Sequence, residues 1–284
     1  MKTSTQLKAL VRNLSKEKNV EAEIILRNFM LERLLERIAI SKYKDNFILK
    51  GGMLIAAMVG IDTRTTMDLD ATIKVRALDE AGVSAIISDI LDIPADDDVS
   101  FTLKEIREIH EEADYPGYRV SIEAVLDKTR QTLKVDITTG DFVTPKEVEY
   151  SFKLMFEDRT ISIMAYNLET VLAEKFETAI TRGLTNTRMR DFYDIYILTA
   201  TQPLNTNTFR AALEKTVEKR HTTAQMAGPE GVIRTIAASD AMDQLWKRYQ
   251  KKYSYANDIT WGMAMEALHK LAERANGRDG HLDT

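Results

Sequence analysis

Hydrophobic residues recur with a helical period over the first 43 residues and again over most of the second half of the chain. Leu7, Leu10, Val11 and Leu14 have the spacing of one helix face, and an amphipathic run over 24–40 predicts a second helix. The apolar run 53–59, which ends at Gly60, predicts a short third helix. Later helices are predicted over 81–91, 168–182, 189–200, 207–219, 238–253 and 259–275.

A period of two residues marks four predicted strands, over 66–76, 99–109, 119–124 and 132–138. The last two strands are joined through Asp127 and Lys128. The acidic run Asp96-Asp97-Asp98 is interpreted as a solvated turn. Because strand patterns stop near residue 165, we expect an α+β domain with N-terminal helices over residues 1–164 and an all-helical domain over residues 165–284.

Composition narrows the class of protein without naming a function. Hydrophobic residues make up 44% of the chain and charged residues 29%, which is typical of a folded domain. Cysteine is absent, which excludes disulfides, zinc–thiolate sites and cysteine nucleophiles. A net charge of −5 argues against a protein that coats nucleic acid without specificity. The polar first 19 residues and the lack of a long apolar stretch predict a cytoplasmic protein with no membrane partner.

Two aspartates carry the clearest chemical signal. Asp68 and Asp70 stand two residues apart in a predicted strand, so their side chains point to the same face. Two carboxylates that close repel each other, and an oxygen-seeking cation such as Mg²⁺ or Mn²⁺ removes the repulsion. An Asp-x-Asp pair also occurs by chance on many solvated sheet faces, and taken alone this pair is better interpreted in that way.

A third carboxylate follows in a later strand. Leu133, Val135 and Ile137 predict a buried face there, which leaves Asp136 on the polar face. If that strand lies beside the strand of Asp68 and Asp70, three carboxylates converge, and they could hold two metals about 3.5–4 Å apart for displacement at phosphorus. Taken alone, Asp136 is better interpreted as a surface residue. The combination with the preceding Gly51-Gly52 turn favours the chemical interpretation.

The order of these motifs resembles the AbiEii/AbiGii-like family, the nucleotidyltransferase-fold toxins of abortive-infection, type IV toxin–antitoxin systems. The resemblance runs over roughly residues 20–200, and the helical C-terminal part adds little to it. The matching motifs are Leu49-Lys50-Gly51-Gly52, residues 64–70 (RTTMDLD), Val135-Asp136-Ile137, Glu174-Lys175-Phe176 and residues 190–195 (RDFYDI).

The resemblance implies a polymerase-β-like nucleotidyltransferase fold with a mixed sheet, followed by an all-helical C-terminal domain. It implies that Gly51 and Gly52 open the helix that binds the triphosphate of an NTP, and that Asp68, Asp70 and Asp136 bind the metal. In the wider superfamily the second glycine position is often serine. Because this chain has Gly52 there, only backbone N–H groups could serve the phosphate at that position.

A second set of candidates lies in the helical half. Helical spacing places Lys175 at the edge of an apolar stripe, where a lysine either extends its ammonium to solvent or reaches a phosphate. Asp191 stands in the first turn of a predicted helix, where it is either a cap or, as the resemblance implies, a catalytic residue; Asp194 is a weaker candidate. Arg190 could bind the nucleotide or pair with these acids.

The resemblance therefore implies a toxin that moves NMP from an NTP to an acceptor hydroxyl, at the 3′ end of tRNA, and so blocks translation. It also implies a separate DNA-binding antitoxin. Transfer to a protein or a small molecule, and a non-catalytic nucleotide-binding module, are the alternatives. Clusters of basic and aromatic residues could line a path for RNA or could be solvated helix faces: Lys247, Arg248, Tyr249, Lys251, Lys252, Tyr253, Lys215, Lys219 and Arg220.

Overall fold

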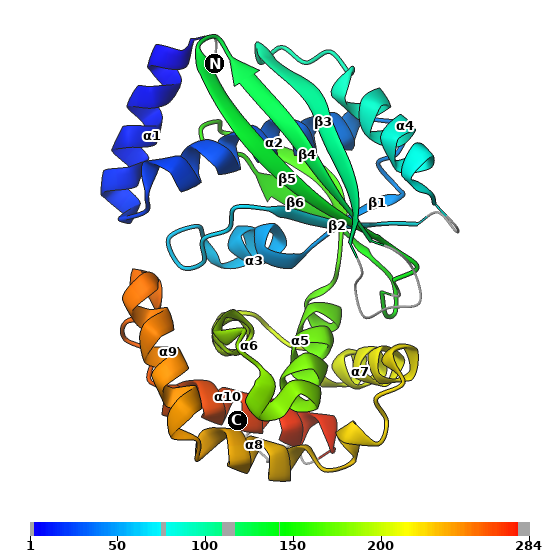
Figure 1. Ribbon diagram of the computed structural model, residues 1–284, viewed down its shortest axis with the longest axis vertical. Coiled ribbons are helices and arrows are strands. Elements are labelled where there is room, and N and C mark those ends of the chain that lie inside the picture. The colour runs from blue at the N-terminus through cyan, green and yellow to red at the C-terminus, as the bar shows by residue number, and fades with distance from the viewer. Residues whose placement is uncertain (1–2, 75–77, 110–116, 142, 278–284) are drawn as a thin grey trace. The chain divides into compact units, whose positions relative to one another are not determined.

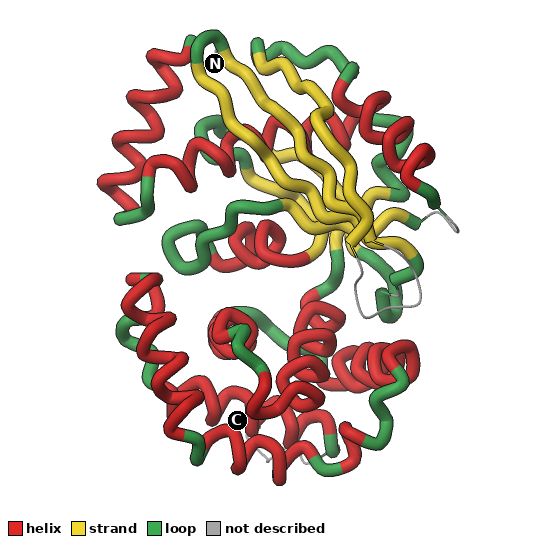
Figure 2. Tube along the Cα trace, viewed as in Figure 1, coloured by secondary structure: helices red, strands yellow, loops and turns green. Residues whose placement is uncertain are grey.

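The computed structural model describes residues 3–74, 78–109, 117–141 and 143–277. Within these ranges the chain forms two compact units. The N-terminal unit contains residues up to 141 and residues 147–166, and the helical unit contains residues 142–146 and those from 167 onward. Every described strand belongs to the N-terminal unit, and the described part of the helical unit contains only helices and loops, as Figure 2 shows.

The N-terminal unit is built on one seven-stranded sheet with the order β3-β4-β5-β2-β1-β7-β6. Strand β1 pairs antiparallel with β2 and parallel with β7, and β2 pairs parallel with β5. The sheet is therefore mixed, as expected for the predicted α+β class. Its strands are β1 (Phe47–Lys50), β2 (Leu69–Ile73), β3 (Val99–Ile109), β4 (Gly117–Leu126), β5 (Thr129–Thr139), β6 (Val148–Lys153) and β7 (Thr160–Ala165).

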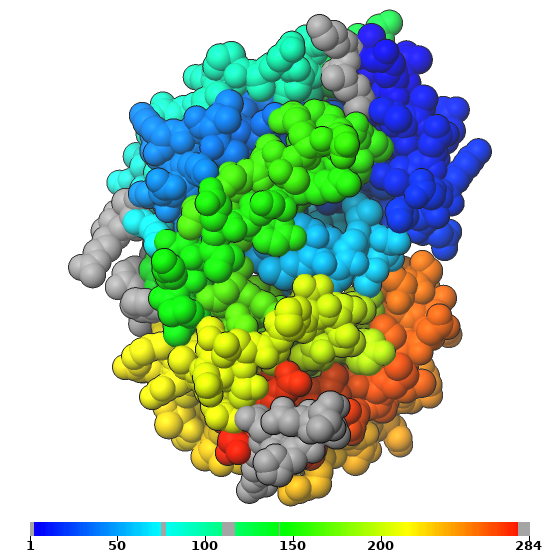
Figure 3. All heavy atoms as spheres, turned by 180° about the vertical axis from the view of Figure 1, so that it is seen from behind, coloured from blue at the N-terminus to red at the C-terminus, as the bar shows by residue number. Residues whose placement is uncertain are grey.

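Four helices accompany the sheet: α1 (Ser4–Lys18), α2 (Ala22–Ile40), α3 (Gly51–Val59) and α4 (Glu80–Leu91). Helix α2 packs against β5 and β7, α1 packs on α2, and α4 packs on β3 (Figure 1). Seen from behind, the β6–β7 hairpin lies beside α2 (Figure 3). Ion pairs join the two, since Arg33 contacts Glu157 at 2.6 Å and Arg159 contacts Glu36 at 2.5 Å.

Strand β2 differs from the strand predicted over 66–76. It is shorter, and Met67, predicted to face the core, is 38% exposed in the segment before it. Thr72, predicted on a polar face, is buried with Leu69 and Ala71. The reason is position, because β2 is a central strand and loses contact with water on both faces over most of its length. Residues 75–76 of the prediction lie outside the described residues.

Asp97 contradicts the interpretation of the acidic run as a solvated turn. Its side chain is buried, and the guanidinium of Arg37 in α2 donates two hydrogen bonds to it, of 2.7 and 2.9 Å. The same guanidinium donates to the carbonyl of Val99 at 2.7 Å and lies over the ring of Phe101. The pair therefore fastens the start of β3 to α2, a contact between residues 60 positions apart.

The helical unit contains α5 (Leu168–Arg182), α6 (Met189–Thr201), α7 (Thr206–Arg220), α8 (Pro229–Ala237), α9 (Asp240–Lys252) and α10 (Trp261–Ala275). Helix α8, which has a proline in its first turn, was not predicted. A cluster of packed rings joins α6, α9 and α10; its members are Phe192, Tyr193, Trp246, Tyr249, Tyr253, Tyr255 and Trp261. Tyr249 is buried in this cluster, so it is no part of an exposed RNA path.

Candidate active site

Four charged residues form one row across the N-terminal sheet. Lys50 of β1 pairs in register with Asp70 of β2, Asp70 with Asp136 of β5, and Asp136 with Arg119 of β4. Residues in register on neighbouring strands point to the same face of a sheet. The row therefore has the charge order plus, minus, minus, plus, and it brings Asp70 and Asp136 together on adjacent parallel strands.

Asp70 lies between Lys50 and Asp136 in the row. Burial raises the pKa of its carboxyl, and the neighbouring carboxylates of Asp136 and Asp68 act in the same direction. The ammonium of Lys50 and the N–H of Gly52 oppose this rise in pKa. That N–H donates to Oδ2 of Asp70 at 3.3 Å. Asp70 thus lies in a strongly charged and poorly hydrated place, which is where a cation gains most from a carboxylate.

The two glycines are required by close packing against this site. Gly51 has φ of +66°, and a Cβ there would lie 2.0 Å from Oδ2 of Asp70. A Cβ on Gly52 would lie 2.6 Å from Oγ1 of Thr66. The pair opens α3, whose first turn has no side-chain cap. Uncapped N–H groups at a helix start suit an anion, although the N–H of Gly52 already faces Asp70.

The loop before β2 is held firmly beside these glycines. Arg64 is 3% exposed and donates to the carbonyl of Thr65. Asn28 of α2 donates to the carbonyl of Thr66 at 2.8 Å. Asp68 follows this loop directly and is partly exposed at the bend before β2. Arg64 therefore braces the segment that carries Asp68.

Asp136 has a partner that sequence reasoning missed. Arg119 donates from Nε to Oδ1 at 2.8 Å and from Nη2 to Oδ2 at 2.6 Å, so both carboxylate oxygens accept a bond. This contact raises the pKa of the Arg119 guanidinium. The signal was in the sequence, because residues equally distant from the turn at Asp127-Lys128 pair across a two-residue hairpin.

Lys50 belongs to a second contact set in the same unit. Its Nζ donates to Oγ1 of Thr138 and to Oδ2 of Asp141, both at 2.7 Å, and Thr138 donates to that same oxygen at 2.6 Å. Neither Thr138 nor Asp141 was among the predicted site residues. These contacts hold the ammonium of Lys50 in place. Its positive charge opposes the rise in the pKa of Asp70.

The donor set fits a hard divalent cation in its chemistry. Asp68, Asp70 and Asp136 offer only oxygens, the ligands that Mg²⁺ and Mn²⁺ prefer, and their mutual repulsion favours a cation between them. Among the described residues, however, no group of three or more acidic or histidine side chains is already arranged to hold a metal. The bidentate bond from Arg119 to Asp136 is one physical reason for this.

In the helical unit, Lys175 joins two of the predicted residues. Its Nζ lies 2.7 Å from Asp191 and 2.8 Å from Asp194, which is fully buried. Burial alone would lower the pKa of Lys175, but the two carboxylates outweigh it and the pKa is raised. Lys175 is therefore a charged lysine held by acids of α6, and its side chain is 16% exposed.

Arg190 contacts the aromatic cluster. Its guanidinium lies over the ring of Tyr253, 5.0 Å from the centroid, and donates to the Tyr253 hydroxyl at 2.8 Å. Basic side chains on α9, among them Lys247, Lys251 and Lys252, are exposed. Lys247 pairs with Asp243 at 2.5 Å. On α7, Arg220 contacts Glu177 at 2.5 Å. Part of this basic material is therefore already paired within the unit.

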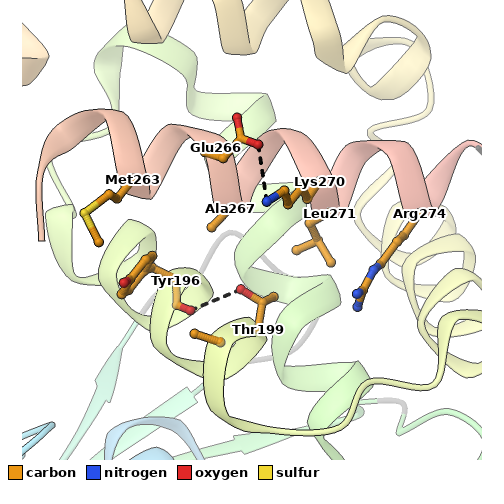
Figure 4. A pocket seen from close by; sticks show the side chains of 9 residues that line it. Tyr196, Thr199, Met263, Glu266, Ala267, Lys270, Leu271 and Arg274 are labelled. Atoms are coloured by element: carbon orange, nitrogen blue, oxygen red, sulfur yellow. Dashed lines mark hydrogen bonds and ion pairs between the residues drawn. The ribbon is translucent and has the colours of Figure 1, made fainter. Parts of the chain in front are cut away.

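A separate pocket of about 250 Å³ lies between α6 and α10 (Figure 4). Tyr196 and Thr199 line it from α6, and Met263 and Leu271 from α10. An ion pair of 3.3 Å between Lys270 and Glu266 lies at its wall. The predicted catalytic, metal and nucleotide residues are absent from the described residues that line this pocket.

The mixed sheet, and the glycine turn packed against a row of strand carboxylates, are features expected of a nucleotidyltransferase. A model of the family described as the nucleotidyl transferase AbiEii toxin of type IV toxin–antitoxin systems matches residues 33–270. The chain therefore belongs to this family. Membership implies an NTP substrate and an antitoxin partner, and nucleotidyltransferases generally use a divalent metal.

One solved structure supports the fold, and a second is similar to the chain. A candidate nucleotidyltransferase from H. pylori is 15% identical, covers 92% of this chain and 100% of its own, and has a TM-score of 0.50. The protein JHP933 from Helicobacter pylori is also 15% identical, over 90% of this chain and 97% of its own, with a TM-score of 0.48. No protein with a curated description matches the sequence significantly. No described helix is long and apolar enough to cross a membrane.

Proposed function

We propose that this enzyme transfers NMP from an NTP to an acceptor hydroxyl at the row of charges in its N-terminal unit. The hydroxyl oxygen bonds to the α-phosphorus, pyrophosphate leaves, and the hydroxyl proton is released. The observation that carries the proposal is the register of Asp70 and Asp136 on adjacent parallel strands, with Gly51 packed on Asp70. Asp68, Asp70 and Asp136 would hold Mg²⁺ or Mn²⁺, which supplies positive charge for the triphosphate. Positioning and electrostatics are the main sources of catalysis in such transfers.

The chain's own residues have distinct tasks in this proposal. Gly51 and Gly52 allow the triphosphate to approach the start of α3, where the N-cap residue Lys50 makes no side-chain capping bond. Lys50, held by Thr138 and Asp141, keeps a positive charge beside Asp70. For Lys175, Asp191 and Arg190 we keep the roles that the family resemblance implies, in catalysis and nucleotide binding. The domains predicted over 1–164 and 165–284 carry these two sets of residues.

For the acceptor we propose the 3′ end of tRNA, because blocking translation there would explain a growth-arresting toxin in a toxin–antitoxin system. Such a toxin would act in the cytoplasm and serve in abortive infection, that is, phage defence. Exposed lysines of α9 offer charge for an RNA backbone.

The test is a transfer assay with each of the four labelled NTPs in the presence of Mg²⁺ or Mn²⁺. Three acceptors are tested separately: deproteinised cellular RNA, cellular protein, and cellular metabolites. Label on tRNA that is lost in Asp70→Asn supports the proposal. Asp92→Asn is the matched control, because it removes one exposed carboxylate outside the row and should transfer normally. Label on protein or metabolites instead of RNA would overturn the tRNA acceptor, and transfer that survives Asp70→Asn would overturn the site.

A further inference from the structure

The contact between Arg119 and Asp136 is the least expected feature of the row. Nε and Nη2 of Arg119 approach the two carboxylate oxygens at 2.8 and 2.6 Å, so the guanidinium takes both of them. This fork geometry is the strongest that arginine offers a carboxylate. A metal ion that binds Asp136 needs at least one of those same oxygens. Arg119 and a metal therefore compete for one ligand.

The two cations that flank the carboxylates differ in how firmly they are held. The side chain of Lys50 is 15% exposed, and Thr138 and Asp141 fix its ammonium. The side chain of Arg119 is 45% exposed, while that of Asp136 is 16% exposed. Arg119 can therefore turn into water at little cost to its own hydration, whereas the largely buried Asp136 stays at the site.

We propose that Arg119 is a positioning residue that serves as an exchangeable counter-cation for Asp136. In the metal-free enzyme it neutralises Asp136, which otherwise faces the carboxylate of Asp70 across the β2–β5 pair, and aims it into the row. A divalent cation that enters the site displaces the guanidinium and takes over the carboxylate. Arg119 thereby lowers the affinity for metal and lets the sheet fold without it. This inference rests on the carboxylate metal site proposed above.

Direct Mn²⁺ binding tests the exchange without any turnover. Free Mn²⁺ is followed by electron paramagnetic resonance during titration of the wild type, Arg119→Gln and Arg119→Lys. Removing the competitor should tighten Mn²⁺ binding in Arg119→Gln by about three- to fivefold, the upper part of the range for an exposed ion pair. Arg119→Lys keeps the charge but loses the fork, and it should bind Mn²⁺ with intermediate affinity.

Arg107→Gln is the matched control. Arg107 pairs with Arg119 in register on the neighbouring strand β3, is more exposed, and contacts Glu105 rather than Asp136. It should leave the Mn²⁺ affinity within twofold of the wild type. In an Asp136→Asn background the gain from Arg119→Gln should disappear, because the ligand that the two cations contest has been removed.

The outcomes separate this inference from the proposed function. If the wild type binds Mn²⁺ and Arg119→Gln binds it equally well or more weakly, the exchange of Arg119 for metal is wrong. The proposed metal site is still supported in that case. The exchange is also wrong if the tighter Mn²⁺ binding persists in the Asp136→Asn background or if Arg107→Gln reproduces it. The change in affinity would then come from the loss of any nearby positive charge. Wild type that binds no Mn²⁺ overturns both the metal site and the exchange. Circular dichroism spectra of each variant confirm that it is folded.

Discussion

Replacing Gly51 by alanine should disturb both the stability of the N-terminal unit and the position of Asp70. The new Cβ would lie 2.0 Å from Oδ2 and 2.7 Å from the Cβ of Asp70. The second distance matters most, because a Cβ cannot swing away as a carboxylate tip can. Either β2 or the start of α3 must move by a few tenths of an ångström or more.

The magnitude follows from three terms. A non-glycine residue at φ of +66° costs about 1–2 kcal/mol. Overpacking against Asp70 costs about 1–3 kcal/mol. The reduced entropy of the unfolded chain returns about 0.4–1 kcal/mol. We therefore expect the free energy of unfolding to fall by about 1–5 kcal/mol.

Urea unfolding followed by circular dichroism measures this loss. Gly231→Ala is the control, and it should change the free energy of unfolding in the opposite direction. Gly231 lies in α8, and a Cβ there would meet only Nη2 of Arg234, at 4.0 Å. It should stabilise the protein by about 0.5–1 kcal/mol. If Gly51→Ala left the free energy of unfolding unchanged or raised it, the proposed packing of Gly51 on Asp70 would be wrong. In the transfer assay the same variant should lose activity because Asp70 is displaced.

Three further changes probe buried charges. Arg37→Ala, which strips the partner from buried Asp97, should cost about 3–5 kcal/mol of unfolding free energy in urea, and a cost near zero would contradict the pairing. Burial raises the pKa of Glu32 from 4.5 to about 8, so the folded state keeps a proton that the unfolded chain loses. Stability should therefore fall as pH rises from about 5 to about 8, by up to about 1.4 kcal/mol per pH unit, and Glu32→Gln should flatten that slope. Lys175→Met removes the ammonium 2.8 Å from buried Asp194 and should cost about 3–5 kcal/mol, whereas exposed Lys247→Met should cost under about 1 kcal/mol.

The local pattern of apolar and polar residues predicted much of the fold, and it predicted on which face of its strand Asp136 lies. The alternation of Leu133, Val135 and Ile137 predicted β5 and placed Asp136 on its polar face, and these three apolar side chains are fully buried. The run over 168–182 predicted α5 with the bounds that the structure has. Such patterns repeat every two or four residues, so a short window of sequence contains the information.

Contacts between distant segments could not be predicted in this way. The burial of Asp97 depends on Arg37, and the fixing of Lys50 depends on Asp141, 91 positions later. A residue's own neighbours in sequence carry no sign of such a partner. Strands β1, β6 and β7 were not predicted. In β1 the first three of four residues are all buried, so that strand shows no alternation of apolar and polar positions. The pairing of Arg119 with Asp136 is an intermediate case. Both residues are equally distant from the hairpin turn, so their pairing could have been predicted once the turn was assigned.

The aromatic cluster has a practical consequence for spectroscopy. The chain has two tryptophans, Trp246 and Trp261, and both belong to the helical unit, where their rings pack 5.7 Å apart. Intrinsic tryptophan emission therefore reports on that unit alone. Comparing its transition with one that follows the sheet would reveal whether the N-terminal unit can unfold while the helical unit stays folded.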